Sequence, residues 1–388
     1  MKTDKKSIRV GVVVASLDIL GGQAVAACRL LDGLRQSKRI HAELIPINPR
    51  LPKWLRWMQR IKYLRTLVTF TYYLFSLLIR IPKFDVLHVF SASNFSFLLA
   101  PAPAVMVGRL FGKPVILNYH SGEAERHLKN WAKTAMPIFK LAHKIIVPSA
   151  YLVGVLAKFG IASEAIPNTV DLGQFRFHQH RPLRPIIFTN RNFETHYNVG
   201  CALRAFALVQ QQIPEMQLII AGDGSQRKQL HELAQKLQLK NLEFVGAVSP
   251  QEMAELYHRA DIYLNASVVD NMPLSILEAF ACGLAVVTTN AGGIPLMVKN
   301  RQNGLLVASG DERALAEAIL AVYRNPRLAD RLIKQALKDC QAFTWNTVGE
   351  RWIALYEQLA CEHSPTSTVT RQPAENEPAI VAQTGGSD

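Results

Sequence analysis

The 388-residue sequence has few cysteines and no cysteine pair. Its five cysteines lie far apart along the chain, at Cys28, Cys201, Cys282, Cys340 and Cys361. Structural zinc sites and disulfide frameworks are built from cysteines at short, characteristic spacings, so neither is expected here. We therefore predict reduced thiols and a cytoplasmic protein.

Acidic residues are missing from a long stretch of the first half. Between Leu44 and Phe84 there is no aspartate or glutamate, although the stretch contains Arg50, Lys53, Arg56, Arg60, Lys62, Arg65, Arg80 and Lys83. The basic excess behind the net charge of +14 is therefore concentrated in the first half. Nucleic-acid binding is the general interpretation of a basic chain, but no recognition module accompanies these cations, and we expect no nucleic-acid partner.

Apolar residues within this basic stretch recur at helical spacing. Intervals of three and four residues separate members of the set Trp54, Trp57, Met58, Ile61 and Leu64, and the neighbouring cations fall off that stripe. The pattern is typical of a basic amphipathic helix on an anionic membrane surface. We predict that residues 50–83 contact such a surface. An ordinary surface helix, with its tryptophans packed on the domain, is the alternative.

The sequence also lacks a long hydrophobic run. The uncharged run from Thr66 to Ile79 falls short of the roughly 20 residues that a spanning helix needs, and we expect no transmembrane span. The N-terminus has basic residues before an apolar run, as a signal peptide does, but it lacks a convincing cleavage site. We interpret Val10 to Val14 as a first buried strand instead.

Short apolar runs alternate with helical stretches along the whole chain. The runs are Val10 to Val14, Leu44 to Ile47, Val86 to Phe90, Val115 to Tyr119, Ile145 to Pro148, Ile186 to Thr189, Leu218 to Ala221, Leu242 to Val245, Ile262 to Leu264 and Val286 to Thr289. Such alternation predicts an α/β fold of two doubly wound, Rossmann-like domains that face an interdomain cleft. We place them at residues 1–180 and 181–345, followed by a helix at 346–362 that crosses back to the first domain and a disordered tail at 363–388.

Charge is nearly absent between Asp270 and Lys299, where Glu278 is the one charged side chain. A carboxylate in an apolar setting needs a partner, and nothing nearby in the sequence offers a cation. A polar ligand is one candidate. Asp270 lies eight residues earlier, in the loop before a helix that begins near Pro273, so both carboxylates could face the cleft.

Glycine turns follow several of the predicted strands. Gly21 and Gly22 stand where a helix begins, and Gly292, Gly293 and Ile294 precede Pro295 in the same way. Backbone amides at such helix starts can bind a phosphate, although a glycine pair is often only a turn. Asp223, between two glycines, also follows a strand and could line the cleft. None of these turns is a GxGxxG motif, which disfavours a nicotinamide dehydrogenase.

Two further polar side chains follow predicted strands. Arg191 comes after the first strand of the second half, and its planar, permanently charged fork suits a diphosphate. His120 follows the fourth strand of the first half, where a neutral imidazole could hold a sugar hydroxyl or relay a proton. A lone histidine is as often structural.

From Arg9 to about Leu359, the chain resembles a family 4 glycosyltransferase of the GT-B fold. The matching features, in order, are the Gly21-Gly22 loop, IPNTVDLGQF from Ile166, Arg191, and DNMPLSILEAFACG with the later NAGGIP and NGLLV. The resemblance implies that the first domain binds an acceptor and the second a nucleotide-sugar, whose sugar is transferred with retention of anomeric configuration. It implies no cofactor and no metal, and the sequence has no convincing DxD pair.

The resemblance also implies roles for individual residues. Glu278 would hold the ribose hydroxyls, and Asp270 would lie near hydroxyls of the donor sugar. Arg191 and the amides around Gly21, Gly22, Gly293 and Ile294 would stabilise the leaving diphosphate, which is the largest catalytic contribution expected. His120 would lie near the reacting sugar.

The chain departs from the family pattern at three positions. Asp270 replaces a glutamate, Leu296 replaces an acidic residue, and His196 with Tyr197 stands where a lysine usually follows the arginine. We predict a cytoplasmic transferase, peripheral on the inner face of the membrane, with a lipid-linked or cell-envelope glycan acceptor. The alternatives are a sugar-nucleotide epimerase of the same fold and a degenerate, non-catalytic nucleotide-sugar-binding protein.

Overall fold

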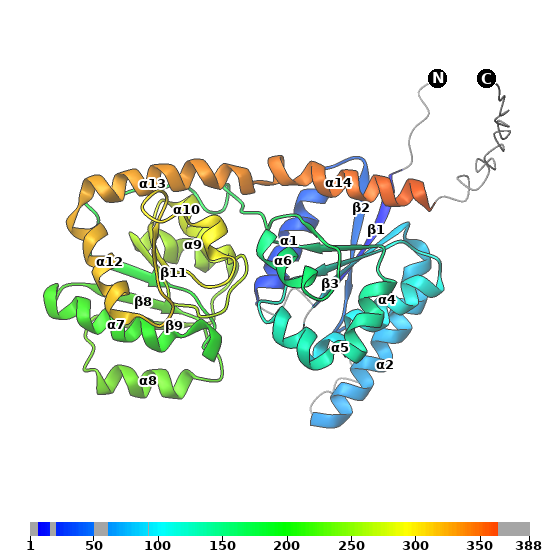
Figure 1. The fold of residues 1–388 in the computed structure, drawn as a ribbon, viewed down its shortest axis with the longest axis horizontal. Coiled ribbons are helices and arrows are strands. Elements are labelled where there is room, and N and C mark those ends of the chain that lie inside the picture. Colours follow the sequence, from blue (N-terminus) through cyan, green and yellow to red (C-terminus); the bar gives the residue numbers. More distant parts are fainter. Residues whose placement is uncertain (1–6, 16–20, 50–60, 92, 364–388) are drawn as a thin grey trace, which may run out of the picture.

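A computed structural model describes residues 7–15, 21–49, 61–91 and 93–363 of the chain. They form two α/β units that lie side by side, each around a six-stranded sheet (Figure 1). Every paired strand in both sheets runs parallel to its neighbour. Parallel strands covered on both faces are buried throughout, which is why their sequences are nearly continuous apolar runs. The predicted fold of two doubly wound domains is confirmed.

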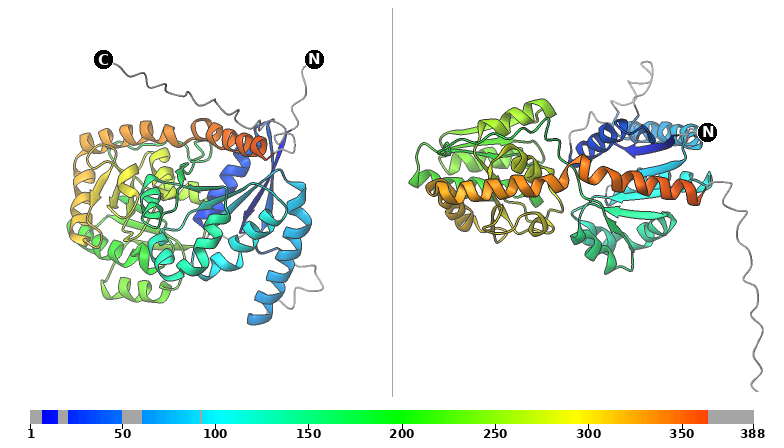
Figure 2. Two further views of the ribbon diagram at one scale, coloured as in Figure 1. Left: turned by 45° about the vertical axis from the view of Figure 1, so that its right-hand side comes forward. Right: turned by 90° about the horizontal axis from the view of Figure 1, so that it is seen from above.

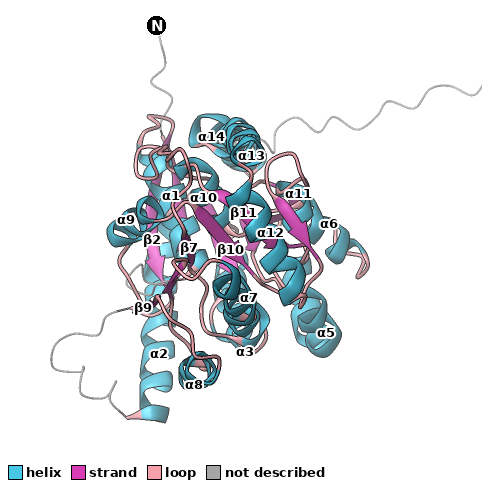
Figure 3. Cartoon of the chain, turned by 90° about the vertical axis from the view of Figure 1, so that its left-hand side faces the viewer, coloured by secondary structure: helices cyan, strands magenta, loops and turns pink. Residues whose placement is uncertain are grey.

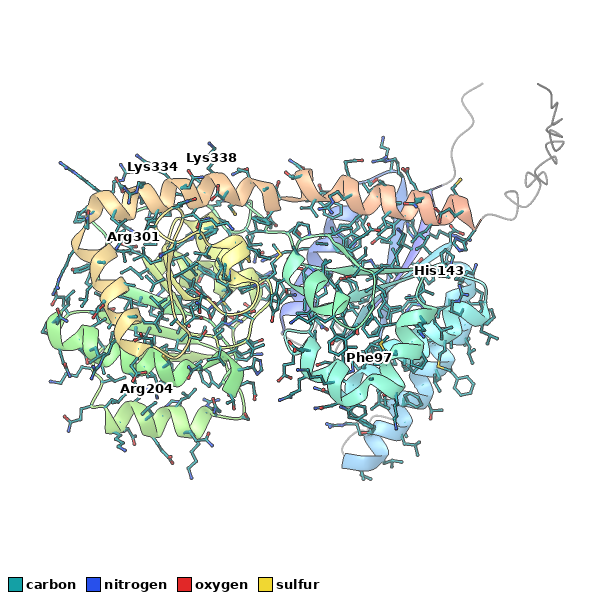
Figure 4. All side chains as sticks on the ribbon, viewed as in Figure 1. Phe97, His143, Arg204, Arg301, Lys334 and Lys338 are labelled. Carbon is teal, nitrogen blue, oxygen red and sulfur yellow. The ribbon has the colours of Figure 1, made fainter. Side chains whose placement is uncertain are left out.

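The first sheet has the strand order β2-β1-β3-β4-β5-β6. Its strands are β1 (Ile8–Val14), β2 (Ile40–Pro46), β3 (Val86–Ser91), β4 (Val115–Tyr119), β5 (Lys144–Val147) and β6 (Glu164–Ala165). The helices around it are α1 (Gly22–Arg35), α2 (Lys62–Arg80), α3 (Phe95–Leu99), α4 (Pro101–Leu110), α5 (Ala124–Leu141) and α6 (Ala150–Ala157), with a 3₁₀ turn at Ile81–Lys83. Figure 4 shows Phe97 of α3 within this domain, where it is fully buried against Phe139.

The second sheet has the strand order β12-β11-β10-β7-β8-β9. Its strands are β7 (Ile186–Thr189), β8 (Gln217–Ala221), β9 (Leu242–Gly246), β10 (Ile262–Asn265), β11 (Ala285–Thr289) and β12 (Leu305–Val307). The helices are α7 (Val199–Gln212), α8 (Arg227–Lys236), α9 (Pro250–Arg259), α10 (Leu274–Cys282), α11 (Ile294–Met297), α12 (Glu312–Arg324) and α13 (Pro326–Cys340), with a 3₁₀ turn at Thr195–Tyr197. Figure 3 shows magenta strands between cyan helices.

The last two helices connect the domains. Helix α13 packs on α10 of the second domain, and after a 3₁₀ turn (Gln341–Phe343) helix α14 (Trp345–Glu362) packs on β1 and α1 of the first (Figure 2). Two contacts fix α14 there. The Tyr356 hydroxyl lies 2.7 Å from Nδ1 of buried His88, and the Trp345 ring packs on Gly33, where a Cβ atom would come within 2.2 Å of it. The region predicted as a disordered tail lies outside the described residues, apart from residue 363.

Helix α2 is longer than the uncharged run of its sequence. The window Leu64–Lys83, with a mean hydropathy of 1.3, is long and apolar enough to cross a membrane by length and composition alone. The argument from length against a span is therefore wrong. However, Tyr73 and Leu77 on the inner face of α2 belong to the core of the first domain, which places this helix against the protein surface. Of the predicted apolar stripe, Trp54, Trp57 and Met58 lie outside the described residues.

Candidate active site

A cleft of about 640 Å³ lies between the two domains. Loops that follow parallel strands of both sheets line it, as expected for sheets whose carboxyl ends face each other. Among its described lining residues are the predicted site residues Gly21, Gly22, His120, Arg191, Asp223, Asp270 and Glu278. The structure therefore brings together side chains and turns that are distant in sequence.

Glu278 lies on α10, a helix that is buried on all sides. Its Oε1 accepts a hydrogen bond from Nη2 of Arg29 at 2.6 Å, and its Oε2 accepts one from the Tyr257 hydroxyl at 2.8 Å. Burial and the neighbouring carboxylate of Glu278 raise the pKa of Tyr257 well above its usual range, so that the phenol remains a donor. The neighbouring sequence offers Glu278 no cation, and the polar ligand considered as its partner stays a prediction. The cation that pairs with Glu278 comes from α1 of the other domain.

Arg191 and Asp270 form an ion pair at the centre of the cleft wall. Arg191 follows β7 and Asp270 precedes α10, and each side chain is only 10% exposed. Nη1 of Arg191 donates to the Ser275 hydroxyl at 3.2 Å, and its guanidinium lies 4.1 Å from the centroid of the Tyr197 ring. Burial alone would lower the pKa of Arg191, but the Asp270 carboxylate together with the nearby tyrosines Tyr197, Tyr263 and Tyr257 more than offsets this, and the pKa lies above its ordinary value.

One nitrogen of Arg191 has no hydrogen-bond partner. Among the described residues, Nε of Arg191 is one of a few buried polar side-chain atoms left without a partner. An unsatisfied buried donor costs about 1–3 kcal/mol, and a charged one costs more.

His120 follows β4 on the opposite wall of the cleft. Its ring lies 5.2 Å from that of Phe90, measured between centroids. Burial lowers the pKa of His120 to about 4. The imidazole is therefore neutral at pH 7, where one ring nitrogen donates a hydrogen bond and the other accepts one.

The two glycine turns differ in their relation to the cleft. Helix α1 begins at Gly22, and a Cβ atom at Gly21 or Gly22 would meet no atom of the described residues within 4 Å, so within the described part of the chain this helix start is open. By contrast, Gly292, Gly293 and Ile294 are not among the described residues that line the cleft.

The second turn packs beneath the loop that carries Asp270. A Cβ atom at Gly292 would approach the Asp270 carbonyl oxygen to 1.9 Å, which requires a glycine there. The amides of Gly293 and Ile294 donate to the carbonyl oxygens of Asp270 and Ala291, at 3.1 and 3.0 Å. Both amides thus have partners within the protein. Their predicted role at the diphosphate stays a prediction. The contacts of Gly292 and Gly293 with Asp270 instead hold the loop that carries Asp270 in place.

Comparison with known proteins assigns both halves of the chain to a family. The sequence profile described as Glycosyltransferase Family 4 matches residues 16–174, and that described as Glycosyl transferases group 1 matches residues 174–339. The chain belongs to the family 4 glycosyltransferases. The predicted family is confirmed.

Relatives of this glycosyltransferase include three characterised groups. Glycogen synthase from Mycobacterium tuberculosis is 28% identical over 66% of this chain and 66% of its own length. Phosphatidyl-myo-inositol mannosyltransferase from Mycobacterium leprae is 23% identical over 72% of this chain and 75% of its own. One component of human phosphatidylinositol N-acetylglucosaminyltransferase is 27% identical, but the match spans only 51% of this chain and 41% of that protein.

Solved structures confirm the two-domain GT-B fold. Sucrose-phosphate synthase from Thermosynechococcus elongatus has a TM-score of 0.69 at 19% identity, covering 92% of this chain and all (100%) of that one. Anabaena HepE, solved with UDP-glucose, has a TM-score of 0.70 at 16% identity, covering 90% and 99%. At these identities the likeness concerns the fold alone.

Two of the departures from the family pattern have clear structural consequences. Tyr197 places its ring against Arg191 where the family usually has a lysine, and Arg29 and Arg191 are the only lysine or arginine residues among the described lining of the cleft. Leu296 is 48% exposed and does not line the described cleft.

Asp223, a predicted site residue, also lines the cleft, and its carboxylate pairs with Arg227 at 3.1 Å.

Sequence reasoning missed two residues that contact Glu278, namely Arg29 and Tyr257. Arg29 has a recognisable signal, because it is a cation between Ala26 and Leu30 on the buried side of α1. A charge at such a position requires a partner across the interface. No comparable signal distinguishes Tyr257 from a core aromatic residue.

Among the described residues no group of three or more His, Cys, Asp or Glu side chains is placed to hold a metal ion. That the reaction needs no metal stays a prediction.

Proposed function

We propose that this enzyme transfers a sugar from a nucleotide-sugar donor to a lipid-linked or cell-envelope glycan acceptor, with retention of anomeric configuration. The observation that carries the proposal is the convergence of Arg191, Glu278 and the open start of α1 on one interdomain cleft. This combination matches the parts of a nucleotide-sugar. A cation and a helix N-terminus suit a diphosphate, and a carboxylate suits the ribose hydroxyls.

The chemistry assigned to the cleft is electrostatic. As the bond between the sugar and the diphosphate breaks, negative charge develops on the departing oxygen. Preorganised donors in a water-poor site stabilise such charge strongly, and Arg191 is held in place by Asp270, Ser275 and Tyr197 before any ligand arrives. Neutral His120 on the opposite wall is suited to hydrogen-bond a hydroxyl of the transferred sugar.

The names of relatives support both ends of the reaction. HepE was solved with UDP-glucose, which supports a nucleotide-sugar donor. The mannosyltransferase and the N-acetylglucosaminyltransferase act, by their names, on phosphatidylinositol lipids, which supports a lipid-linked acceptor. These relatives are transferases or synthases, so they do not favour the epimerase alternative.

A screen of UDP-, GDP- and ADP-sugars by thermal shift tests the donor part. We expect one nucleotide series to raise the melting temperature, because a ligand at 100 times its Kd stabilises the folded state by about 2.7 kcal/mol. Transfer is then measured as nucleotide release that depends on an acceptor, and NMR of the product reports its anomeric configuration. Sugar released or isomerised without an acceptor would favour the epimerase. Binding without turnover on a broad acceptor panel would favour the degenerate binding protein.

Contact with an anionic membrane is the second part of the proposal. On the outer face of α2, Leu67, Phe75 and Ile79 are 63%, 60% and 63% exposed, opposite the buried Tyr73 and Leu77. The helix is flanked by basic residues and stands in a segment without acidic residues. Exposed apolar side chains with surrounding cations match the interface of an anionic bilayer. We propose that the enzyme is peripheral on the cytoplasmic face.

Removing the apolar face of α2 should weaken vesicle binding. For the triple variant Leu67→Ser, Phe75→Ser and Ile79→Ser, we expect partitioning onto phosphatidylglycerol vesicles to fall about tenfold or more, because the lost side chains can no longer enter the bilayer. Co-sedimentation measures this. The matched control replaces Phe177 and Leu296, which are 45% and 48% exposed elsewhere, by serine. Equal vesicle binding by wild type and the triple variant would contradict the proposal.

A further inference from the structure

Arg29 is fixed by contacts with three separate segments. Its Nη2 donates to Oε1 of Glu278 at 2.6 Å, and its Nη1 donates to the Thr169 carbonyl oxygen at 2.9 Å. The guanidinium carbon also lies 5.3 Å from the centroid of the Phe175 ring. The Arg29 side chain is 10% exposed and that of Glu278 is 8% exposed. The ion pair is therefore well shielded from water, and three separate contacts fix the position of the Arg29 side chain.

The Glu278 carboxylate retains free acceptor capacity. An ionised carboxylate offers roughly four lone-pair positions. Arg29 and Tyr257 each use one of them, and each uses a different oxygen. Glu278 also lines the cleft, so its remaining lone pairs are available to hydroxyl groups of a ligand. A vicinal pair of hydroxyls, as on a ribose, matches two adjacent carboxylate oxygens.

The pair joins the two domains. Arg29 is on α1 of the first domain and Glu278 is on α10 of the second, 249 residues away. Further contacts between the domains hold α10 close to α1. The Asn168 side-chain amide donates to the Met272 carbonyl oxygen at 3.1 Å, and Leu274 packs into the core of the first domain. Glu278 thus has its cation in the arrangement of the two domains that this structure shows.

We propose that Arg29 is a positioning residue for the donor site. By balancing the charge of Glu278 and directing one of its oxygens, Arg29 leaves the other lone pairs aimed at the 2′ and 3′ hydroxyls of the donor ribose. The inference rests on the proposed function, because it requires a nucleotide in the cleft. It assigns to Arg29 of the first domain a part in ribose recognition that acts through Glu278 of the second domain.

The test compares nucleotides with and without the ribose hydroxyls. Calorimetry gives the Kd of UDP and of 2′,3′-dideoxy-UDP, and the GDP and ADP pairs are measured in the same way. We expect wild type to prefer the hydroxylated nucleotide about tenfold or more, because hydrogen bonds to a charged group are strong. Arg29→Met should reduce this preference to about threefold or less. Arg29→Lys, which keeps the charge, should recover part of it. If Arg29→Met does not fold, Arg29→Gln takes its place.

A matched control is Arg39→Met, which removes an exposed arginine that pairs with Glu350 and Glu357. It should leave the preference unchanged. A residue with only a structural role would weaken the binding of both nucleotides equally. An unchanged preference for the hydroxylated nucleotide in Arg29→Met therefore overturns the inference. So does an Arg29→Lys variant whose preference is no greater than that of Arg29→Met. Tighter UDP binding by Arg29→Met also overturns it, because Arg29 would then compete with the ribose. If wild type binds none of UDP, GDP and ADP, the proposed function itself fails, and the inference with it.

Discussion

Replacing Arg191 by lysine should lower kcat about 100-fold, with a smaller effect on the KM of the donor. Lysine keeps the positive charge, so Asp270 retains a cation, but a single ammonium group cannot contact Asp270, Ser275 and a leaving diphosphate together. Losing one preorganised donor to developing charge typically costs about 100- to 1,000-fold in kcat. Steady-state kinetics with the donor found by thermal shift measures the effect.

The control for this variant is Arg184→Lys. Arg184 also pairs with a buried aspartate in the second domain, Asp261, at 2.8 Å, and neither residue is among the described lining of the cleft. This control makes the same arginine-to-lysine change beside a buried aspartate. We expect its kcat to stay within about twofold of wild type. A kcat for Arg191→Lys close to that of wild type would show that Arg191 does not stabilise the leaving group.

Strand positions were predictable because parallel strands have a distinctive sequence. Each apolar run interpreted as a strand overlaps a strand of the structure, from β1 at Ile8–Val14 to β11 at Ala285–Thr289. The central strands are buried on both faces and have no polar side to interrupt the apolar run. The edge strands β2 and β9 are less buried and carry exposed Glu43 and Glu243. Two strands were missed, β6 (Glu164–Ala165) and β12 (Leu305–Val307), which are 2 and 3 residues long. Such short segments carry too little pattern to separate them from loops.

The length of α2 was misjudged for a different reason. The argument used the uncharged run from Thr66 to Ile79, whereas the helix continues through charged residues to Arg80. Lysine and arginine are good helix formers, so charge does not end a helix. Charge limits only the part that can be buried in an apolar medium. The extent of a helix and the extent of its apolar segment are separate quantities.

The site was predicted in its location and only partly in its contacts. Residues that follow strands meet at the carboxyl edges of the sheets, so His120, Arg191 and Asp270 could be placed in one cleft between the two predicted domains from their positions along the chain. The pairing of side chains within the cleft depends on how the domains dock, as for Arg29 and Glu278, or on which strands lie side by side within one domain, as for Arg191 and Asp270. Arg29 and Glu278 are 249 residues apart, and Arg191 and Asp270 are 79 apart. Inspection of neighbouring sequence cannot reveal such partners.

Glu278→Gln should raise the Kd of the donor nucleotide about 10- to 100-fold. Glutamine has nearly the same shape and can still accept the Tyr257 hydrogen bond, but it lacks the charge that strengthens hydrogen bonds from ribose hydroxyls. The nucleotide lacking both hydroxyls should bind wild type and variant with similar affinity, because it does not use this carboxylate. Calorimetry with both nucleotides separates loss of ribose recognition from general damage to the cleft.

The same change should also lower the free energy of unfolding. Arg29 loses its anionic partner, and breaking a well-buried ion pair can cost about 3 kcal/mol or more. Opening of the cleft would let water reach the Arg29 guanidinium, so we expect a loss of at most about 3 kcal/mol. Glu243→Gln, which removes an exposed pair with Arg259 in the same domain, is the matched control and should change neither quantity measurably. Donor affinity within about twofold of wild type in Glu278→Gln would contradict the assignment of this carboxylate to the ribose, whatever its effect on stability.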